Sequence, residues 1–335
     1  MTGNARRAIV VVALATCAAL GLAAVAHAGN AGFAPVTPRS PNAAGINRAY
    51  ELIALLTFII FVVVEGTLIW IIVRHRNRGR PRTAEGPQIH AHARLELIWT
   101  VIPVLILAAI ISFVLYKLPG IEDVPAAKAQ GGPLVIRVDG HQFYWQFTYP
   151  NGAVSIDRLV VPAHRVVKVE IHSQDVIHSW WVPALGGKFD AIPGRTNHTW
   201  FKADKIGTYD GRCGEFCGAF HGLMTSQVVA TTPSKYVSYV ANLRKPSVLG
   251  GQEWRGVCAT CHNIAGTGGY GPAIATNQTL VQPLSLVSLL RNGQNVLPPV
   301  SKYMPPVGHG WTAFQFAALE QYLKQHVYKG TTSGG

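Results

Sequence analysis

The chain has 335 residues, and only 13% of them are charged, about half the roughly 25% that is usual in soluble domains. Its mean hydropathy is +0.22, which argues against a disordered chain. The net charge of +13 is unevenly distributed along the chain. Residues 1–120 contain 11 Lys and Arg and 4 Asp and Glu, residues 121–240 contain 11 and 10, and residues 241–335 contain 7 and 2. Most of the positive charge lies among apolar runs, which favours membrane topology over a nucleic-acid-binding face.

The first 28 residues have the pattern of an export signal. Two Arg residues precede an apolar stretch over 8–25, and an Ala-His-Ala tripeptide ends at Ala28, as expected at a cleavage site. Two alternatives stay open: the long apolar stretch could remain as an uncleaved anchor, and Cys17 lies in a poor match to a lipoprotein motif. The sequence predicts a signal peptide over 1–28.

Two later apolar runs, 50–73 and 97–116, are each long enough to cross about 30 Å of hydrocarbon. The short loop between them is rich in Arg, so the positive-inside rule places it in the cytoplasm and the rest of the chain outside. Glu65 interrupts the first run. A carboxyl inside a membrane span is costly and is by default a functional candidate, although a hydrated position near the cytoplasmic end is equally consistent.

The composition and expected secondary structure of the exported part change twice along the chain. From residue 121 to 240, short β-rich segments separated by turn residues favour a sandwich or barrel. These segments are 134–138, 143–149, 166–171, 196–201, 207–211 and 226–231. From residue 241 to 335, helical segments dominate and end with 312–325, between loops rich in Gly and Pro. So small a helical unit needs something large and apolar to fold around.

The helical part contains Cys258-Ala-Thr-Cys261-His262, the attachment signature of c-type haem. Two thiols would bond the haem vinyl groups, and the adjacent imidazole would reach the iron. Met304 is the predicted second axial ligand, because a Met and His pair gives a high-potential electron-transfer iron. His309 and His326 are its rivals. The alternative for an exported chain is a local disulfide.

A second motif, Cys213-x-Glu-x-Cys217-x3-His221-x2-Met224, is accompanied by a separate His178. Thiolates, imidazoles and a thioether suit copper rather than Mg²⁺ or Ca²⁺. A disulfide would leave the His and Met at matched spacing unexplained. A single blue copper needs one Cys, so two bridging thiolates predict two copper ions in one site.

These motifs together resemble those of subunit II of haem–copper cytochrome c oxidase, with a cytochrome c domain fused at the C-terminus in the caa-type arrangement. The residues that carry the resemblance are 96–103, 140–145, 178–183 and 213–224. The resemblance implies a multidomain fold: a two-helix transmembrane hairpin, a cupredoxin-like Greek-key β-barrel or sandwich over 121–240, and an all-α class I cytochrome c domain over 241–335.

The resemblance also implies roles for matched residues. Cys213 and Cys217 would bridge the two coppers of a CuA centre, His178 and His221 would each bind one copper, and Met224 and the Glu215 carbonyl would be weak axial ligands. The Glu215 carboxylate would meet a Mg²⁺ or Mn²⁺ shared with subunit I. Glu65 matches the glutamate at the mouth of a proton channel.

The implied function is electron transfer in a proton-pumping oxidase of the bacterial inner membrane. Electrons from an external cytochrome c or another donor would pass through the chain's own haem and CuA to subunit I, which reduces O2, with subunit III as a further partner. The alternative is the CuA subunit of a nitric oxide reductase-type complex. A membrane-tethered electron-transfer or copper-assembly protein acting alone is a rival, whereas quinol oxidase relatives lack the copper ligands.

Overall fold

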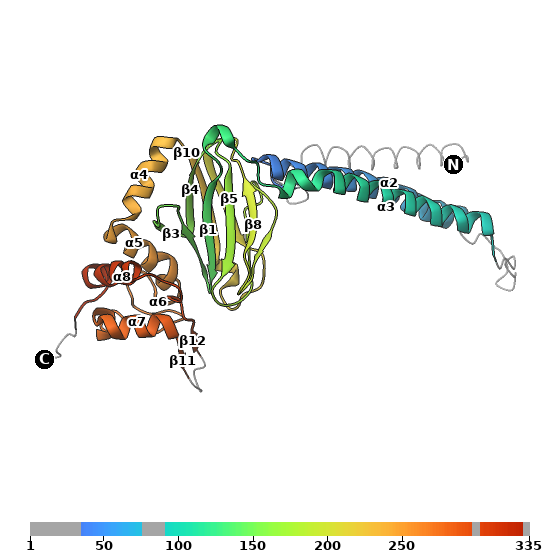
Figure 1. The fold of residues 1–335 in the computed structure, drawn as a ribbon. Helices are drawn as coiled ribbons and strands as arrows, with labels where there is room; N and C mark the ends of the chain where they lie inside the picture. The colour runs from blue at the N-terminus through green and yellow to red at the C-terminus, as the bar shows by residue number, and fades with distance from the viewer. Residues whose placement is uncertain (1–34, 76–90, 297–301, 331–335) are drawn as a thin grey trace, which may run out of the picture. The chain divides into compact units, whose positions relative to one another are not determined.

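The computed structural model describes residues 35–75, 91–296 and 302–330. The expected signal peptide and most of the Arg-rich loop lie outside these residues. The described chain forms two compact units, one built on two long helices and the other comprising Pro38–Ala43 together with everything from Glu122 onward. Figure 1 shows the order of the elements.

Helices α2 (Pro41–His75) and α3 (Ala93–Glu122) contain the two predicted apolar runs. Both are long and apolar enough to cross a membrane, and the side chains of their most apolar windows are not buried by the protein. Gly45 near the start of α2 lies against Ile121 near the end of α3, so the two helices form an antiparallel hairpin. The exposed apolar surface requires a lipid or protein environment.

Helix α2 begins well before the predicted apolar run. Pro41 occupies its first position, where the missing N–H costs nothing. The Ser40 hydroxyl bonds the Asn42 side chain at 2.6 Å, and the Asn42 amide donates to the Trp200 carbonyl. These buried polar contacts fix the first turn onto the β-sandwich.

The sandwich consists of two five-stranded sheets, in the orders β3-β2-β1-β5-β8 and β4-β10-β9-β6-β7. The strands of the first sheet are β1 (Leu134–His141), β2 (Tyr144–Thr148), β3 (Val154–Ile156), β5 (Val167–Ser173) and β8 (Asn197–Phe201). Those of the second are β4 (Arg158–Pro162), β6 (His178–Trp181), β7 (Phe189–Ala191), β9 (Gly207–Cys213) and β10 (Thr225–Thr231). All six predicted β-segments are strands.

The strands alternate in the way that a sandwich requires. In β5 every second side chain is buried, beginning with Val167, because successive side chains point to opposite faces of a sheet. Strand β1 pairs in parallel with β5, and β10 pairs in parallel with β4. Each of these pairings joins strands of the same sheet that are not consecutive in the chain. The two sheets pack around one apolar core, to which Trp145, Phe147 and Leu159 contribute fully buried side chains.

The C-terminal segment is mainly helical. Its elements are α4 (Pro233–Leu243), α5 (Pro246–Glu253), a π-helical turn η3 (Trp254–Cys258), α6 (Ala259–His262), η4 (Gln278–Val281), α7 (Pro283–Asn292) and α8 (Ala313–His326). Helices α4, α5 and α7 each begin with Pro, and α8 begins with a capping box at Thr312.

Two features of this segment differ from the sequence expectation. Helix α4 spans the expected boundary between residues 240 and 241, because its Val240 and Leu243 pack into the core of the sandwich. A small antiparallel hairpin, β11 (Gln294–Val296) and β12 (Lys302–Met304), also interrupts the helices. The segment is therefore not purely α-helical.

Candidate functional site

The β9–β10 hairpin carries most of the predicted copper ligands. Cys213 ends β9, Met224 directly precedes β10, and the Cys213 N–H donates to the Met224 carbonyl at 2.9 Å. The connecting loop returns on itself, with His221 in the short 3-10 helix η2 (His221–Leu223). The Cys217 sulfur lies 3.7 Å from both His221 Nδ1 and Met224 Sδ.

A second strand supplies the remaining imidazole. His178 begins β6, which pairs with β9, and its Nδ1 lies 3.9 Å from the Cys213 sulfur. The same sulfur is 3.2 Å from the Glu215 carbonyl oxygen. One ligand atom from each of His178, Cys213 and Cys217 lies within 4.8 Å of the others. The predicted copper ligands thus converge on one place.

The His178 ring is oriented by Asp175, a residue that the sequence reasoning missed. Its Nε2 lies 2.7 Å from an Asp175 carboxylate oxygen, which leaves Nδ1 free to face the sulfurs. Burial opposes the charged imidazole, but the hydrogen bond to Asp175 and the nearby Cys213 raise the pKa of His178. A carboxylate behind a ligating imidazole fixes its tautomer and its orientation. The only sequence signal was a polar turn just before His178.

The two thiols differ in acidity. The interaction between the two sulfurs lowers the pKa of Cys213 and raises that of Cys217, and burial adds to the rise at Cys217. Both are buried free thiols. Two buried sulfurs, two imidazoles and a thioether in contact form a donor set suited to a soft or borderline metal such as copper. The residues present therefore fit a copper site.

Gln142, which directly follows strand β1, supports the loop between β9 and β10 through hydrogen bonds. Its side-chain amide donates to the Cys217 carbonyl at 2.6 Å, and its backbone N–H donates to Asp175 at 2.6 Å. Gly218 has a φ of +128°, and a Cβ there would lie 3.0 Å from the Phe143 ring. Only glycine accommodates both this conformation and this close approach.

The Glu215 carboxylate pairs with a lysine at the surface. It lies 3.3 Å from the Lys188 ammonium, and both side chains are nearly half exposed. It is thus accessible to a partner subunit, and its role in binding Mg²⁺ stays a prediction. Glu65 lies on an exposed face within α2, and its role in proton transfer also stays a prediction.

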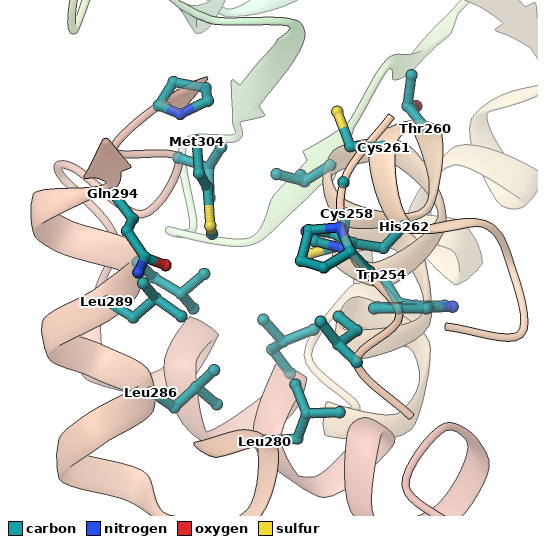
Figure 2. Close-up of a pocket in the computed structure, with 18 of the residues that line it drawn as sticks. Trp254, Cys258, Thr260, Cys261, His262, Leu280, Leu286, Leu289, Gln294 and Met304 are labelled. Carbon is teal, nitrogen blue, oxygen red and sulfur yellow. The ribbon is translucent and has the colours of Figure 1, made fainter. Parts of the chain in front are cut away.

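The C-terminal segment contains an apolar cavity. The predicted haem residues Cys258, Cys261, His262 and Met304 all line it, together with several Leu side chains. Figure 2 shows His262 and Met304 on opposite sides of this cavity, with Leu280, Leu286 and Leu289 below them. The π-helical turn that ends at Cys258 is a type of distortion frequent at functional sites. The four residues therefore fit a bound haem.

The His262 ring is also oriented. Its Nδ1 lies 2.9 Å from the Pro272 carbonyl oxygen, so Nδ1 donates and Nε2 is left to face the cavity. A Cβ on Gly271 would come within 2.6 Å of this ring. Neither His309 nor His326, both within the described residues, lines the cavity. The geometry favours Met304 as the residue opposite His262.

Aromatic side chains lie between the two sites. Gln142 and Phe143, from the copper side, also line the apolar cavity. The Phe143 ring is 5.5 Å from that of Phe220, which in turn is 4.8 Å from that of Tyr270 near His262. Phe220 directly precedes the copper-site residue His221. The haem-type cavity and the copper-type loop are therefore in direct contact.

The fold and the site together define a membrane-anchored protein with a cupredoxin-like domain that brings together His and Cys side chains able to hold a metal ion. Two family descriptions match the chain: the transmembrane domain of cytochrome c oxidase subunit II at residues 29–116, and its periplasmic domain at 153–231. Neither description extends into the C-terminal helical segment.

Individual relatives carry the same subunit name. Cytochrome c oxidase subunit 2 of Alkalihalophilus pseudofirmus is 34% identical over 73% of this chain and 75% of its own length. The probable cytochrome c oxidase subunit 2 of Rickettsia bellii is 32% identical over 65% of this chain and 86% of its own. The crystal structure of the periplasmic domain of subunit II of cytochrome oxidase from Bradyrhizobium japonicum is 34% identical, covers 36% of this chain and 96% of that chain, and has a TM-score of 0.33.

The chain belongs to the cytochrome c oxidase subunit II family, a component of haem–copper oxidases. The family domain implies a CuA copper site, with which the His178, Cys213 and Cys217 group is consistent. The names of the relatives support an oxidase rather than the alternative reductase.

Proposed function

We propose that this chain receives electrons through a covalently bound haem c in its C-terminal segment and passes them to a dinuclear CuA centre. The electrons then reach the haem–copper subunit I of a proton-pumping terminal oxidase, where O2 is reduced to water. The observation that carries the proposal is the contact between the cavity lined by Cys258, Cys261 and His262 and the copper-side residues Gln142 and Phe143.

The residues support this assignment by holding their donor atoms in place. Cys213 and Cys217 would bridge two copper ions, His178 and His221 would each bind one, and Met224 and the Glu215 carbonyl would be weak ligands. Two coppers that share one electron exchange it with little change in geometry, which is the chemistry that CuA supplies when bound. His178 and Cys213 sit on strands β6 and β9. The loop that carries Cys217 and His221 is closed by the hydrogen bond from the Cys213 N–H to the Met224 carbonyl, so rigid elements flank the whole site.

In the C-terminal segment, Cys258 and Cys261 would attach the haem, and His262 and Met304 would bind its iron. The apolar lining of the cavity would exclude water from the faces of that haem, and the Pro272 carbonyl holds the imidazole. We assign residues 241–335 to this cytochrome c domain, 121–240 to the CuA domain, and 29–120 to the N-terminal segment with the two membrane helices.

The proposed setting is the bacterial inner membrane. Helices α2 and α3 would span it, with both redox domains on the periplasmic side. Subunit I would contact the CuA domain and share a Mg²⁺ with the Glu215 carboxylate, and subunit III would complete the complex. The external donor is a cytochrome c or another electron carrier.

Metal and haem analysis of the purified complex tests the proposal. We expect two coppers in addition to the copper of subunit I, and one haem c, for each copy of this chain, with the haem remaining on the chain after denaturation. Cys217→Ser should abolish the copper signal and leave the haem. Met304→Ala should remove the weak near-infrared band of Met-bound ferric haem and leave the copper. One copper with a blue-copper spectrum, or a haem released by denaturation, would contradict the assignment.

A further inference from the structure

The interface between the β-sandwich and the C-terminal helices is built into strand β2. Because side chains alternate along a strand, Trp145 and Phe147 face the core of the sandwich, whereas Tyr144 packs with the apolar core of the C-terminal helices. Gln146 lies on the same face as Tyr144 and accepts from the Gln315 amide of α8 at 2.8 Å. This strand is therefore buried on both faces.

Tyr144 makes the most specific contact across this interface. Its side chain is fully buried, and its hydroxyl donates to the Val307 carbonyl at 2.5 Å. The same hydroxyl accepts from the Trp311 indole N–H at 2.8 Å. Val307 follows Met304 by three positions, so both bonds are made to the segment that continues from the predicted iron ligand.

The other side of Tyr144 leads toward the copper ligands. Its ring stacks on that of His141, with centroids 4.5 Å apart and planes within 9°. His141 follows Gly140, whose backbone lies so close to His178 that a Cβ would come within 2.9 Å of the imidazole. Tyr144 thus stands between the segment that carries Met304 and the strand end against which His178 packs.

We propose that Tyr144 is a positioning residue whose hydroxyl holds the Met304 segment against the copper domain, so that the copper domain controls Met304's bond to the haem iron. The inference rests on the proposed function, because Met304 has an iron to bind only when haem is attached. The physical reason is that a phenylalanine at this position would leave the Val307 carbonyl and the Trp311 N–H without their buried partner. Buried polar groups without partners are costly, so the segment would shift or admit water.

The test compares Tyr144→Phe with Tyr149→Phe in the complete oxidase complex. Tyr149 is a matched control, because it is also a buried tyrosine of the sandwich and its hydroxyl accepts from the Val160 N–H at 2.9 Å. We expect Tyr144→Phe to weaken the near-infrared Met–iron band and to lower the haem potential, because loss of a Met ligand lowers it. The copper EPR signal should stay unchanged, and Tyr149→Phe should leave both haem properties at wild-type values.

A second variant and a second measurement keep the outcome decisive. Trp311→Phe removes one of the two hydrogen bonds from the opposite side and should reproduce part of the effect. Amide hydrogen exchange over residues 302–311 should be at least several-fold faster in Tyr144→Phe than in Tyr149→Phe, whether or not haem is bound. If the wild-type chain carries no covalent haem, the proposed function is wrong, but the hydrogen-exchange measurement still tests the role of Tyr144. Equal exchange, or an equal band and potential, in the two tyrosine variants would overturn the positioning role, as would loss of the copper signal in Tyr144→Phe.

Discussion

Glycine at position 140 shows how closely the predicted copper ligand His178 is packed. A Cβ at this residue would lie 2.9 Å from Cδ2 of His178 and 3.2 Å from the Trp145 ring. His178 cannot retreat freely, because it is fully buried and bonded to Asp175. The absence of a side chain at Gly140 is therefore part of the construction of the site.

We expect Gly140→Ala to displace His178 and to lower the copper content of the purified protein. Overpacking of this kind costs about 1–3 kcal/mol. Copper analysis and thermal unfolding check the result, with Gly207→Ala as the control, since a Cβ there would lie no closer than 3.8 Å to Tyr209. Full copper occupancy in Gly140→Ala would show that the imidazole has room to move.

Glu253 is the second residue that stands out. Its side chain is fully buried at the end of α5, and neither carboxylate oxygen has a hydrogen-bond partner at normal distance among the described residues. Burial raises its pKa well above the usual value, and the proximity of Gln315 only partly offsets this. Burial therefore favours the neutral, protonated form of the Glu253 carboxyl in the folded protein.

This predicts a pH dependence with a definite sign. Above the unfolded pKa of 4.5 the folded state holds a proton that the unfolded state has lost, so stability falls as the pH rises, by at most about 1.4 kcal/mol per pH unit. Glu253→Gln should remove this decline. The melting temperature of the variant minus that of the wild type should therefore increase as the pH is raised from 5 to 8. Parallel curves for Glu253→Gln and wild type would refute the buried carboxyl.

Among the elements, the packing of α5 against α8 sets the shape of the C-terminal segment. Gly250 of α5 faces the backbone of α8, and a Cβ would lie 2.1 Å from the Ala318 carbonyl oxygen. The neighbouring Gly251 meets only the far ends of the Tyr322 and Arg255 side chains, at 3.1 Å or more. Two adjacent glycines thus differ in what surrounds them.

We expect opposite effects from the two alanine substitutions. Gly250→Ala must separate two helices, and we expect it to destabilise the segment by about 3 kcal/mol or more, the upper end for overpacking, with reduced haem incorporation. Gly251→Ala should be neutral or slightly stabilising, because alanine favours a helix by up to about 1 kcal/mol over glycine. Haem content and protease resistance of the two variants measure the difference, and similar behaviour would disprove the close helix contact.

At the scale of the whole molecule, the two compact units have different surfaces. The helices α2 and α3 expose apolar side chains along their length, whereas the sandwich and the C-terminal helices bury theirs in two adjoining cores. Glu65 is a carboxyl within the exposed apolar surface of α2. In the assembled oxidase this surface meets lipid or another subunit, where an ionisable group is costly unless it has a function.

If Glu65 feeds a proton path, Glu65→Gln should slow steady-state turnover several-fold and leave the rate of copper reduction unchanged. Glutamine keeps the size of the side chain and removes its proton exchange. Glu51→Gln on the same helix is the control, since Glu51 bonds Asn47 at 2.6 Å near the start of the helix. Equal turnover for Glu65→Gln and wild type would favour a hydrated carboxyl without a function.

The sequence alone determined the features that reside in contiguous residues. The apolar runs, the Cys213–Met224 spacing and the Cys258–His262 motif are local patterns, and their elements are α2, α3, the β9–β10 hairpin and the turn before His262. The strands β3, β4, β6 and β7 were not predicted. Strands β3, β6 and β7 have four residues or fewer, which is too short for a clear alternation, and β4 buries three consecutive residues instead of alternating.

Only the tertiary structure decided which distant groups support the sites. Asp175 behind His178 and Pro272 behind His262 depend on how loops return to the core. Helix α4 crosses the expected domain boundary because its apolar face packs on the sandwich, and Tyr144 reaches Val307 because strand β2 is covered on both faces. A local pattern reports the chemistry of neighbouring residues, whereas these contacts join residues brought together by burial and hydrogen bonding across the fold.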